Sequence, residues 1–266
     1  MSIRSLLISV VLSAFTVAPA FAHAGFLVLV SDKSGESGEV TLYATFSDIF
    51  PEPEIALRSN AWTIVTPSGG SLNFADIASS NSRTVLRAFL TETGTYRLST
   101  GERLGRTGEI AWMDGQYVYL GADGVARDRL SADARILTSQ TATVSDIYLS
   151  RGAPDTGPPA SRIGRLAIIP AINPASLEPG GTFSLSVEFD GAPLADTQVT
   201  VFSPSSVRDE GVPETTRMTD TNGVLHLEAL ERGLYLVMVR HVAPAPEGAA
   251  TDVRSYTTTL TLNVNG

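Results

Sequence analysis

Residues 182–189 have the sequence Thr-Phe-Ser-Leu-Ser-Val-Glu-Phe, in which an apolar side chain occupies every second position. A period of two places these side chains on one face of a β-strand, because successive side chains in a strand point to opposite sides. The same alternation returns in residues 39–46, 198–202 and 257–264. This pattern predicts an all-β chain that is built from half-buried strands.

Turn signals separate the alternating runs at short intervals. The clearest are residues 67–70 (Pro-Ser-Gly-Gly), 114–115 (Asp-Gly), 190–191 (Asp-Gly) and 222–223 (Asn-Gly). Gly, Asn and Asp accept the positive φ angles that tight hairpin turns require. Many short strands joined by such turns are typical of β-sandwiches. Helical periodicity is weak, and residues 130–138 are the best candidate for a short helix.

Composition divides the chain of 266 residues into four parts. Residues 1–22 combine Arg4, a mostly apolar run and the small-x-small end Ala20-Phe21-Ala22, which is typical of a secretory signal peptide. Residues 151–162 contain three Pro and two Gly and no aromatic residue, and they predict a semi-stiff linker. We therefore expect a signal peptide (1–22), an N-terminal β-rich domain (23–150), a linker (151–162) and a C-terminal β-sandwich domain (163–266).

The C-terminal domain has about the length of one immunoglobulin-like or fibronectin-like sandwich, which is ~100 residues. Its alternating runs predict strands over residues 165–169, 182–189, 198–202, 215–218, 224–230, 234–241 and 256–264. Leu236 lies inside the strongly apolar run 234–239, so we expect its side chain to belong to the core.

Composition also excludes several classes of function. The chain has 19 Lys and Arg against 28 Asp and Glu, a net charge of −9, and such a chain repels a phosphate backbone, so we expect no nucleic-acid partner. The absence of Cys excludes disulfides, Cys-based zinc sites and thiol nucleophiles. No run after residue 22 approaches ~18 apolar residues, so we expect an exported, soluble protein without a transmembrane segment. No Gly-x-Ser-x-Gly elbow and no Gly-rich phosphate loop occurs, so we expect no enzymatic activity.

Two of the three histidines predict a metal site. Cleavage after Ala22 makes His23 the first residue, and an N-terminal His offers its α-amine and its ring Nδ1 as a chelate for copper, nickel, cobalt or zinc. His241 ends an apolar run beside a loop rich in Pro, Ala and Gly, which is where site residues often lie. If the first strand pairs across the domain boundary, His23 and His241 converge. An oxygen ligand would come from Asp48, Glu52, Glu54 or Asp252, and we take Asp48 and Glu52 first.

Simpler interpretations of the histidines stay open. His241 at a strand end would equally cap a backbone carbonyl. His226 lies between Leu225 and Leu227, so strand parity turns it away from them and favours an exposed or hydrogen-bonded ring.

Aromatic residues in the first unit allow two interpretations. They would form a face on which a sugar ring stacks, or they would pack in the core and as cross-strand pairs. The residues in question are Trp62, Trp112, Tyr117 and Tyr119.

Residues 164–174 open the second unit with the sequence Gly-Arg-Leu-Ala-Ile-Ile-Pro-Ala-Ile-Asn-Pro. Residues 177–180 (Leu-Glu-Pro-Gly), 219–223 (Thr-Asp-Thr-Asn-Gly) and 231–236 (Glu-Arg-Gly-Leu-Tyr-Leu) continue a pattern that resembles the domain-of-unknown-function 4198 (DUF4198) family. Residues 148–154 (Tyr-Leu-Ser-Arg-Gly-Ala-Pro) and the mature start His23-Ala24 resemble the same family.

This resemblance implies an exported bacterial protein, labelled as a periplasmic component of nickel or cobalt uptake. It also implies a metal ion as ligand and a membrane metal-uptake system as partner. Family members often carry His-x-His at the mature start, whereas this chain has Gly25 in place of the second His. The alternative function is a non-catalytic envelope adaptor or a module that binds a carbohydrate or a protein.

Overall fold

The computed structural model describes residues 23–121, 124–153, 162–205, 215–228 and 230–265. The predicted signal peptide and residues 154–161 of the predicted linker lie outside this part of the chain. The regular structure of the described residues is almost entirely β-strand, with two short 3₁₀ helices, η1 (Arg127–Arg129) and η2 (Pro174–Ser176), which confirms the all-β prediction. No helix among them is long and apolar enough to span a membrane.

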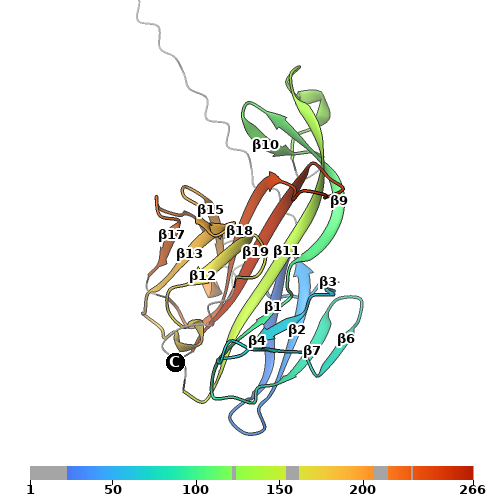
Figure 1. The fold of residues 1–266 in the computed structure, drawn as a ribbon. Helices are drawn as coiled ribbons and strands as arrows, with labels where there is room; N and C mark the ends of the chain where they lie inside the picture. Colours follow the sequence, from blue (N-terminus) through green and yellow to red (C-terminus); the bar gives the residue numbers. More distant parts are fainter. Residues whose placement is uncertain (1–22, 122–123, 154–161, 206–214, 229, 266) are drawn as a thin grey trace, which may run out of the picture.

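The first lobe is a sandwich of two β-sheets (Figure 1). One layer consists of β1 (Ala24–Lys33), β2 (Glu39–Ser47), β7 (Thr84–Phe89) and β6 (Asp76–Ser79), with β3 (Ile55–Ala56) beside β2. The facing layer consists of β11 (Arg135–Arg151), β8 (Gly94–Ser99), β4 (Thr63–Val65) and β5 (Ser71–Leu72). Alternate side chains of both layers, such as Leu42, Leu86 and Leu98, form one buried core.

The second lobe is a sandwich as well. One layer consists of β12 (Leu166–Pro170), β13 (Phe183–Phe189), β14 (Ala192–Pro193) and β17 (Val224–Leu227). The other consists of β16 (Thr215–Met218), β15 (Gln198–Phe202), β18 (Gly233–Pro244) and β19 (Val253–Val264). Phe183, Leu185 and Val187 pack against Val237 and Val239 in its core. The sequence predicted all of these strands except β14, although β17 ends three residues early, β18 continues three residues beyond the expected end and β19 begins three residues early.

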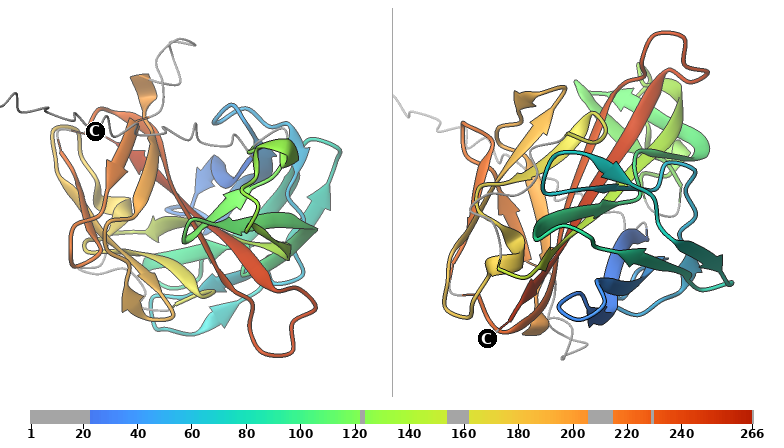
Figure 2. Two further views of the ribbon diagram at one scale, coloured as in Figure 1. Left: turned by 90° about the horizontal axis from the view of Figure 1, so that it is seen from above. Right: turned by 60° about the horizontal axis from the view of Figure 1, so that its bottom comes forward.

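A continuous sheet joins the two lobes. β11, the last strand of the first lobe, pairs in parallel with β19, the last strand of the second, over residues 139–147 of β11. Figure 2 shows β19, in red, between the yellow and orange strands of the second lobe and the blue and green strands of the first. A separate buried cluster, which includes Phe26, Phe50, Leu236 and Met238, packs β1 against β18. The lobes therefore share both a sheet and an apolar interface.

An extension projects beyond the two sandwiches (Figure 1). It consists of β9 (Arg103–Met113), β10 (Gln116–Tyr119) and the first residues of β11, and we call it the arm. Asp114 and Gly115 join β9 to β10 with positive φ angles of 52° and 77°, as the Asp-Gly turn signal predicts. The predicted helix over 130–138 is wrong, because β11 begins at Arg135 and is paired there with β9.

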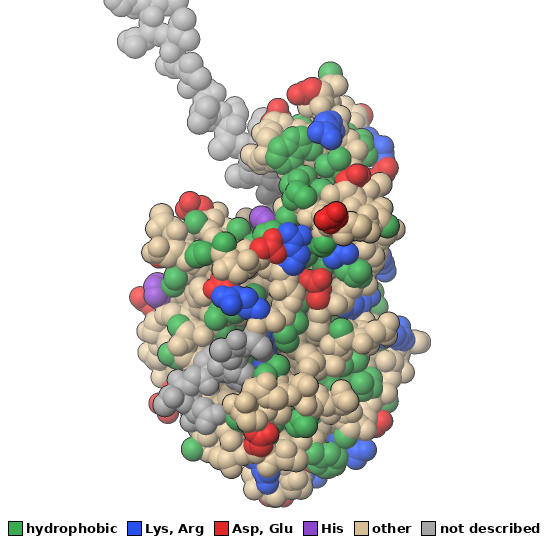
Figure 3. Space-filling model, in the orientation of Figure 1, with side chains coloured by type: hydrophobic (Ala, Val, Ile, Leu, Met, Phe, Trp, Pro, Cys, Tyr) green, Lys and Arg blue, Asp and Glu red, His purple; other side chains and the backbone are tan. Residues whose placement is uncertain are grey.

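Charged side chains are mixed on the surface. On the face in Figure 3, acidic and basic groups are interspersed, and neither sign forms a large patch.

Candidate functional site

The sheet of the first lobe brings His23, Asp48 and Glu54 to one end. The pairing of β1 with β2 ends at Ala24 and Ser47, the chain neighbours of His23 and Asp48. Both side chains therefore lie at the same end of the sheet. β3 begins directly after Glu54 and pairs with Thr45 and Phe46 near the end of β2. This pairing brings Glu54 to the same end of the sheet. The register of three neighbouring strands therefore places an imidazole and two carboxylates together.

The imidazole of His23 lies between the two carboxylates. Its Nδ1 is 3.4 Å from Oδ1 of Asp48, and its Nε2 is 3.2 Å from Oε1 of Glu54. One possible ligand atom from each residue lies within 4.8 Å of the others. The side chains are 36%, 43% and 52% exposed, so an ion can reach them from solvent. In the described ranges, no other group of three His, Cys, Asp or Glu meets this geometry.

Apolar residues hold the loop that carries both carboxylates. Phe50 is buried and meets Phe26 edge to face, with 5.0 Å between ring centroids. The Tyr43 hydroxyl donates a hydrogen bond of 2.5 Å to the carbonyl of Pro51. The middle of the loop is thus anchored in the core, while Asp48 and Glu54 at its two ends stay near the surface.

The sequence around this site also identifies the family. The model of the family described as Domain of unknown function (DUF4198) matches residues 20–243, which contain all three residues of the cluster. The chain belongs to the DUF4198 family. A search of curated proteins finds no match. Among solved structures, this DUF4198 chain is similar to the D0-D1 domain of Intimin, with 13% identity, a TM-score of 0.22, and 91% of this chain and 98% of that chain covered.

Glu52 of the DUF4198 chain lies outside the cluster, although the sequence made it a first candidate. Its carboxylate is exposed, and it acts on Tyr43 instead: burial, and then the charge of Glu52, raise the pKa of that phenol. Glu54 occupies the position beside His23. The register of β3 determines which of the two carboxylates lies beside His23. The sequence of the loop does not reveal this register, because the loop contains both residues.

His241 does not meet His23. β18 turns Leu236 and Met238 toward β1, whereas His241 has the opposite parity and faces the second lobe. There its ring contacts Phe189, with 4.6 Å between ring centroids. The three-nitrogen set that combined the two histidines is therefore absent, because successive residues of one strand face opposite lobes. Asp252, another candidate oxygen ligand, lies far along the sheet and binds Thr138.

The charges of Arg165 and Asp190 act on the His241 ring. Arg165 Nε donates a hydrogen bond of 2.6 Å to Asp190, and its guanidinium carbon lies 4.6 Å from the centroid of the Phe189 ring. Burial lowers the pKa of His241, the charge of Arg165 lowers it further, and the Asp190 carboxylate opposes both effects. The net effect is a pKa below the usual value, which favours the neutral form of the ring.

We expect His241 to make the folded state less stable as the pH falls. Its folded-state pKa lies below the unfolded value of about 6.5, so the unfolded chain binds the proton first. The contribution is complete above that value and is lost as the pH falls toward the folded-state pKa. Thermal melts should show a smaller decrease in Tm between about pH 7 and pH 5 for His241→Gln than for the wild type.

The matched control is His226→Gln. His226 lies exposed on β17, where its Nδ1 is 2.7 Å from Ser184 Oγ, as its strand parity predicts. This variant should keep the wild-type dependence of Tm on pH. If His241→Gln also kept it, the assignment of a lowered pKa to His241 would be wrong.

The four aromatic residues named from the sequence separate into two groups. Trp62 meets Phe74 edge to face, with 5.9 Å between centroids, and packs against the core of the first lobe. Trp112, Tyr117 and Tyr119 lie together on the arm, outside both cores. A single aromatic face made by all four is therefore absent.

Proposed function

We propose that this protein binds one divalent transition-metal ion, nickel, cobalt or copper, and carries it through the periplasm for uptake or handover to a membrane metal-uptake system. The convergence of His23, Asp48 and Glu54 at one end of the sheet is the observation that supports this function. Imidazole nitrogen with carboxylate oxygen is a donor set that suits these ions. The proposed role is binding and release without catalysis.

The two ring nitrogens of His23 have different roles in this proposal. One ion cannot bind both nitrogens of a single imidazole. Nδ1 and the Asp48 oxygen, 3.4 Å apart, have the separation of two ligands that are each about 2.0–2.2 Å from one ion. Nε2 then donates to Glu54, which fixes the tautomer and orientation of the ring, as carboxylates beside metal-binding histidines commonly do.

The α-amine of His23 completes the proposed site. Removal of the leader after Ala22 frees this amine, and it chelates the same ion as Nδ1. In a chain that keeps the leader, this nitrogen belongs to a peptide bond and the free amine is absent. Protons compete with the metal for all these donors, so acid releases the ion.

Isothermal titration of the chain that begins at His23 should show one high-affinity site for copper, nickel or cobalt, with zinc as a comparison ion. Acetylation of the His23 α-amine should weaken binding strongly, because it removes the chelating amine without introducing another one beside the ring. Asp48→Asn should weaken binding by removing a ligand. Glu54→Gln should weaken it about 10–100-fold, the usual effect of losing an outer-shell carboxylate.

Glu52→Gln is the matched control, because it removes a carboxylate of the same loop that lies outside the cluster. Its affinity should equal that of the wild type. Copper-loaded protein should also show nitrogen hyperfine coupling in its electron paramagnetic resonance spectrum, and His23→Ala should lose it. Equal affinity of wild type and His23→Ala would eliminate this site.

A further inference from the structure

A second candidate site lies on the arm, where one row of residues crosses three strands. Tyr117 of β10 is paired with Trp112 of β9, and Trp112 is paired with Arg135 of β11. Directly paired residues of antiparallel strands have their side chains on the same face of the sheet. The rings of Trp112 and Tyr117 meet edge to face, with 4.6 Å between centroids. The row therefore presents two aromatic rings and a guanidinium side by side.

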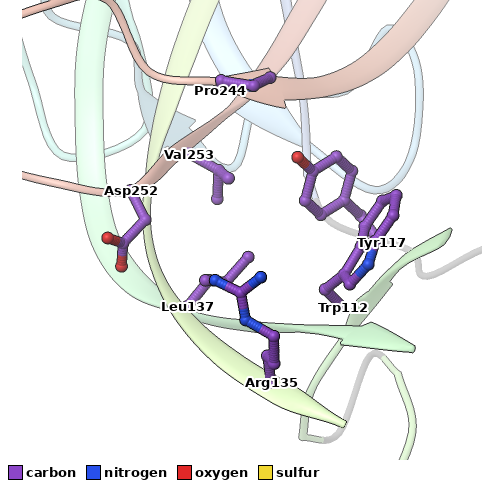
Figure 4. Close-up of a pocket in the computed structure, with 7 residues that line it drawn as sticks. All are labelled: Trp112, Tyr117, Arg135, Leu137, Pro244, Asp252 and Val253. Carbon is purple, nitrogen blue, oxygen red and sulfur yellow. The ribbon is translucent and has the colours of Figure 1, made fainter. Parts of the chain in front are cut away.

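The opposite wall of this site comes from the second lobe. Pro244 at the end of β18 is paired with Val253 at the start of β19. Leu137 lies two residues beyond Arg135 on β11 and so faces the same side. These apolar side chains and the aromatic row line a pocket of about 280 Å³, open to solvent (Figure 4).

Hydrogen bonds fix the arm against the second lobe. The hydroxyl of Tyr119 lies 2.6 Å from Oγ of Ser255 on β19. Asp252 Oδ2 accepts hydrogen bonds from the backbone N–H and the hydroxyl of Thr138, at 2.8 and 2.6 Å. Figure 4 shows that the Asp252 carboxylate turns away from the aromatic rings. The Asp252 carboxylate thus connects β11 to the second lobe, and the pocket is already formed without a ligand.

Arg135 supplies the charge of the pocket. Its guanidinium points into the hollow beside Leu137 (Figure 4). Throughout the described ranges it has no hydrogen bond or ion pair, and Asp252 is the nearby carboxylate on whose pKa it acts. A guanidinium offers several N–H donors in a plane, which match the two oxygens of a carboxylate. Arg135 is exposed, so an anion that enters the pocket from solvent can pair with its guanidinium.

We propose that the pocket binds a single six-membered ring that carries a carboxylate, as a hexuronic acid does. The carboxylate pairs with Arg135, while the ring packs between the aromatic side chains and Leu137 and Val253. The volume of about 280 Å³ is near the lower end of ligand pockets, about 300–1,000 Å³, and fits one ring. The hydroxyl of Tyr117 is placed to bind a hydroxyl of a sugar. This site shares no residue with the His23 cluster, so it stands independently of the proposed metal function.

Tryptophan fluorescence is a direct test. The chain has two Trp. Trp62 packs against Phe74 in the first lobe, so Trp112 reports on the pocket. Titration with galacturonate or glucuronate should change the fluorescence saturably, whereas neutral galactose should not. Benzoate tests whether an aromatic acid supplies the same chemistry. Binding of the hexuronates alone identifies a sugar, and binding of benzoate alone identifies an aromatic acid.

Two variants and one control complete the test. Arg135→Gln should weaken binding of the acidic ring at least about tenfold, the loss of one charged hydrogen-bonded contact. Trp112→Ala, followed by calorimetry because it removes the reporter, should abolish binding. Arg129→Gln changes an exposed Arg of η1 outside the pocket and should have no effect.

Three results would overturn the proposal. The first is no saturable binding of any acidic ring up to about 10 mM, far above the concentrations that a specific site requires. The second is binding of galactose as tight as that of galacturonate. The third is unchanged affinity in Arg135→Gln, with its thermal melt equal to that of the wild type.

Discussion

Leu236→Asp is expected to unfold both lobes at room temperature. Leu236 is fully buried, is paired on both sides within the shared sheet, and packs against Phe26 and Phe50 of the first lobe. Loss of a buried Leu side chain costs about 2–5 kcal/mol. An unpaired carboxylate at the same position adds several kcal/mol. The sum approaches or exceeds the total stability of about 5–15 kcal/mol that proteins usually have.

Circular dichroism melts and Trp62 fluorescence measure this effect. Melts should lose the cooperative transition, and the fluorescence of Trp62, in the first lobe, should change although the substitution lies in the second. Met218→Asp is the control in the same sheet, because Met218 is 55% exposed on β16. It should alter stability by no more than about 0.5 kcal/mol. A cooperative melt of Leu236→Asp near the wild-type Tm would contradict the position of β18.

Asp146→Asn is expected to cost about 3–5 kcal/mol of unfolding free energy, the usual result of leaving one buried charge without its partner. Arg97 on β8 and Asp146 on β11 form an ion pair of 2.5 Å, with side chains that are 0% and 3% exposed. Burial alone would lower the pKa of Arg97, but the Asp146 carboxylate raises it above its usual value. Asn keeps the shape and removes the charge that the arginine requires.

Urea denaturation should show a lower midpoint with an unchanged slope for Asp146→Asn. Asp76→Asn, exposed on β6, is the control and should stay within about 0.5 kcal/mol of the wild type. The double variant Arg97→Met/Asp146→Leu should recover most of the loss, because neither side chain then carries a charge. A loss below about 1 kcal/mol in Asp146→Asn would show that the pair is solvated.

Part of the second lobe could be predicted from the sequence because some of its strands, such as β13, alternate between buried and partly buried residues. Residues 198–202 and 215–218 form β15 and β16 with the expected bounds. The arm was harder to predict. Residues 130–138 suggested a helix because the start of β11 is exposed on both faces, and an exposed strand carries no regular apolar period.

The candidate metal site was predictable only in part. His23 and Asp48 were chosen for their chemistry, and the pairing of β1 with β2 brings them together. Glu54 rather than Glu52 completes the cluster, and His241 lies on the far side of β18. Those outcomes depend on which strands are neighbours, and a single sequence does not contain that information.

The amino-acid sequence by itself determined the all-β class, the positions of most strands and the residue types that can bind a metal, because these depend on local periodicity and on side-chain chemistry. Only the tertiary structure decided that β11 pairs with β19, which joins the lobes and brings together the residues that line the pocket at Arg135. The physical reason is that hydrogen bonds between distant strands are set by register and by packing of the whole chain. Neither leaves a signal within any one segment.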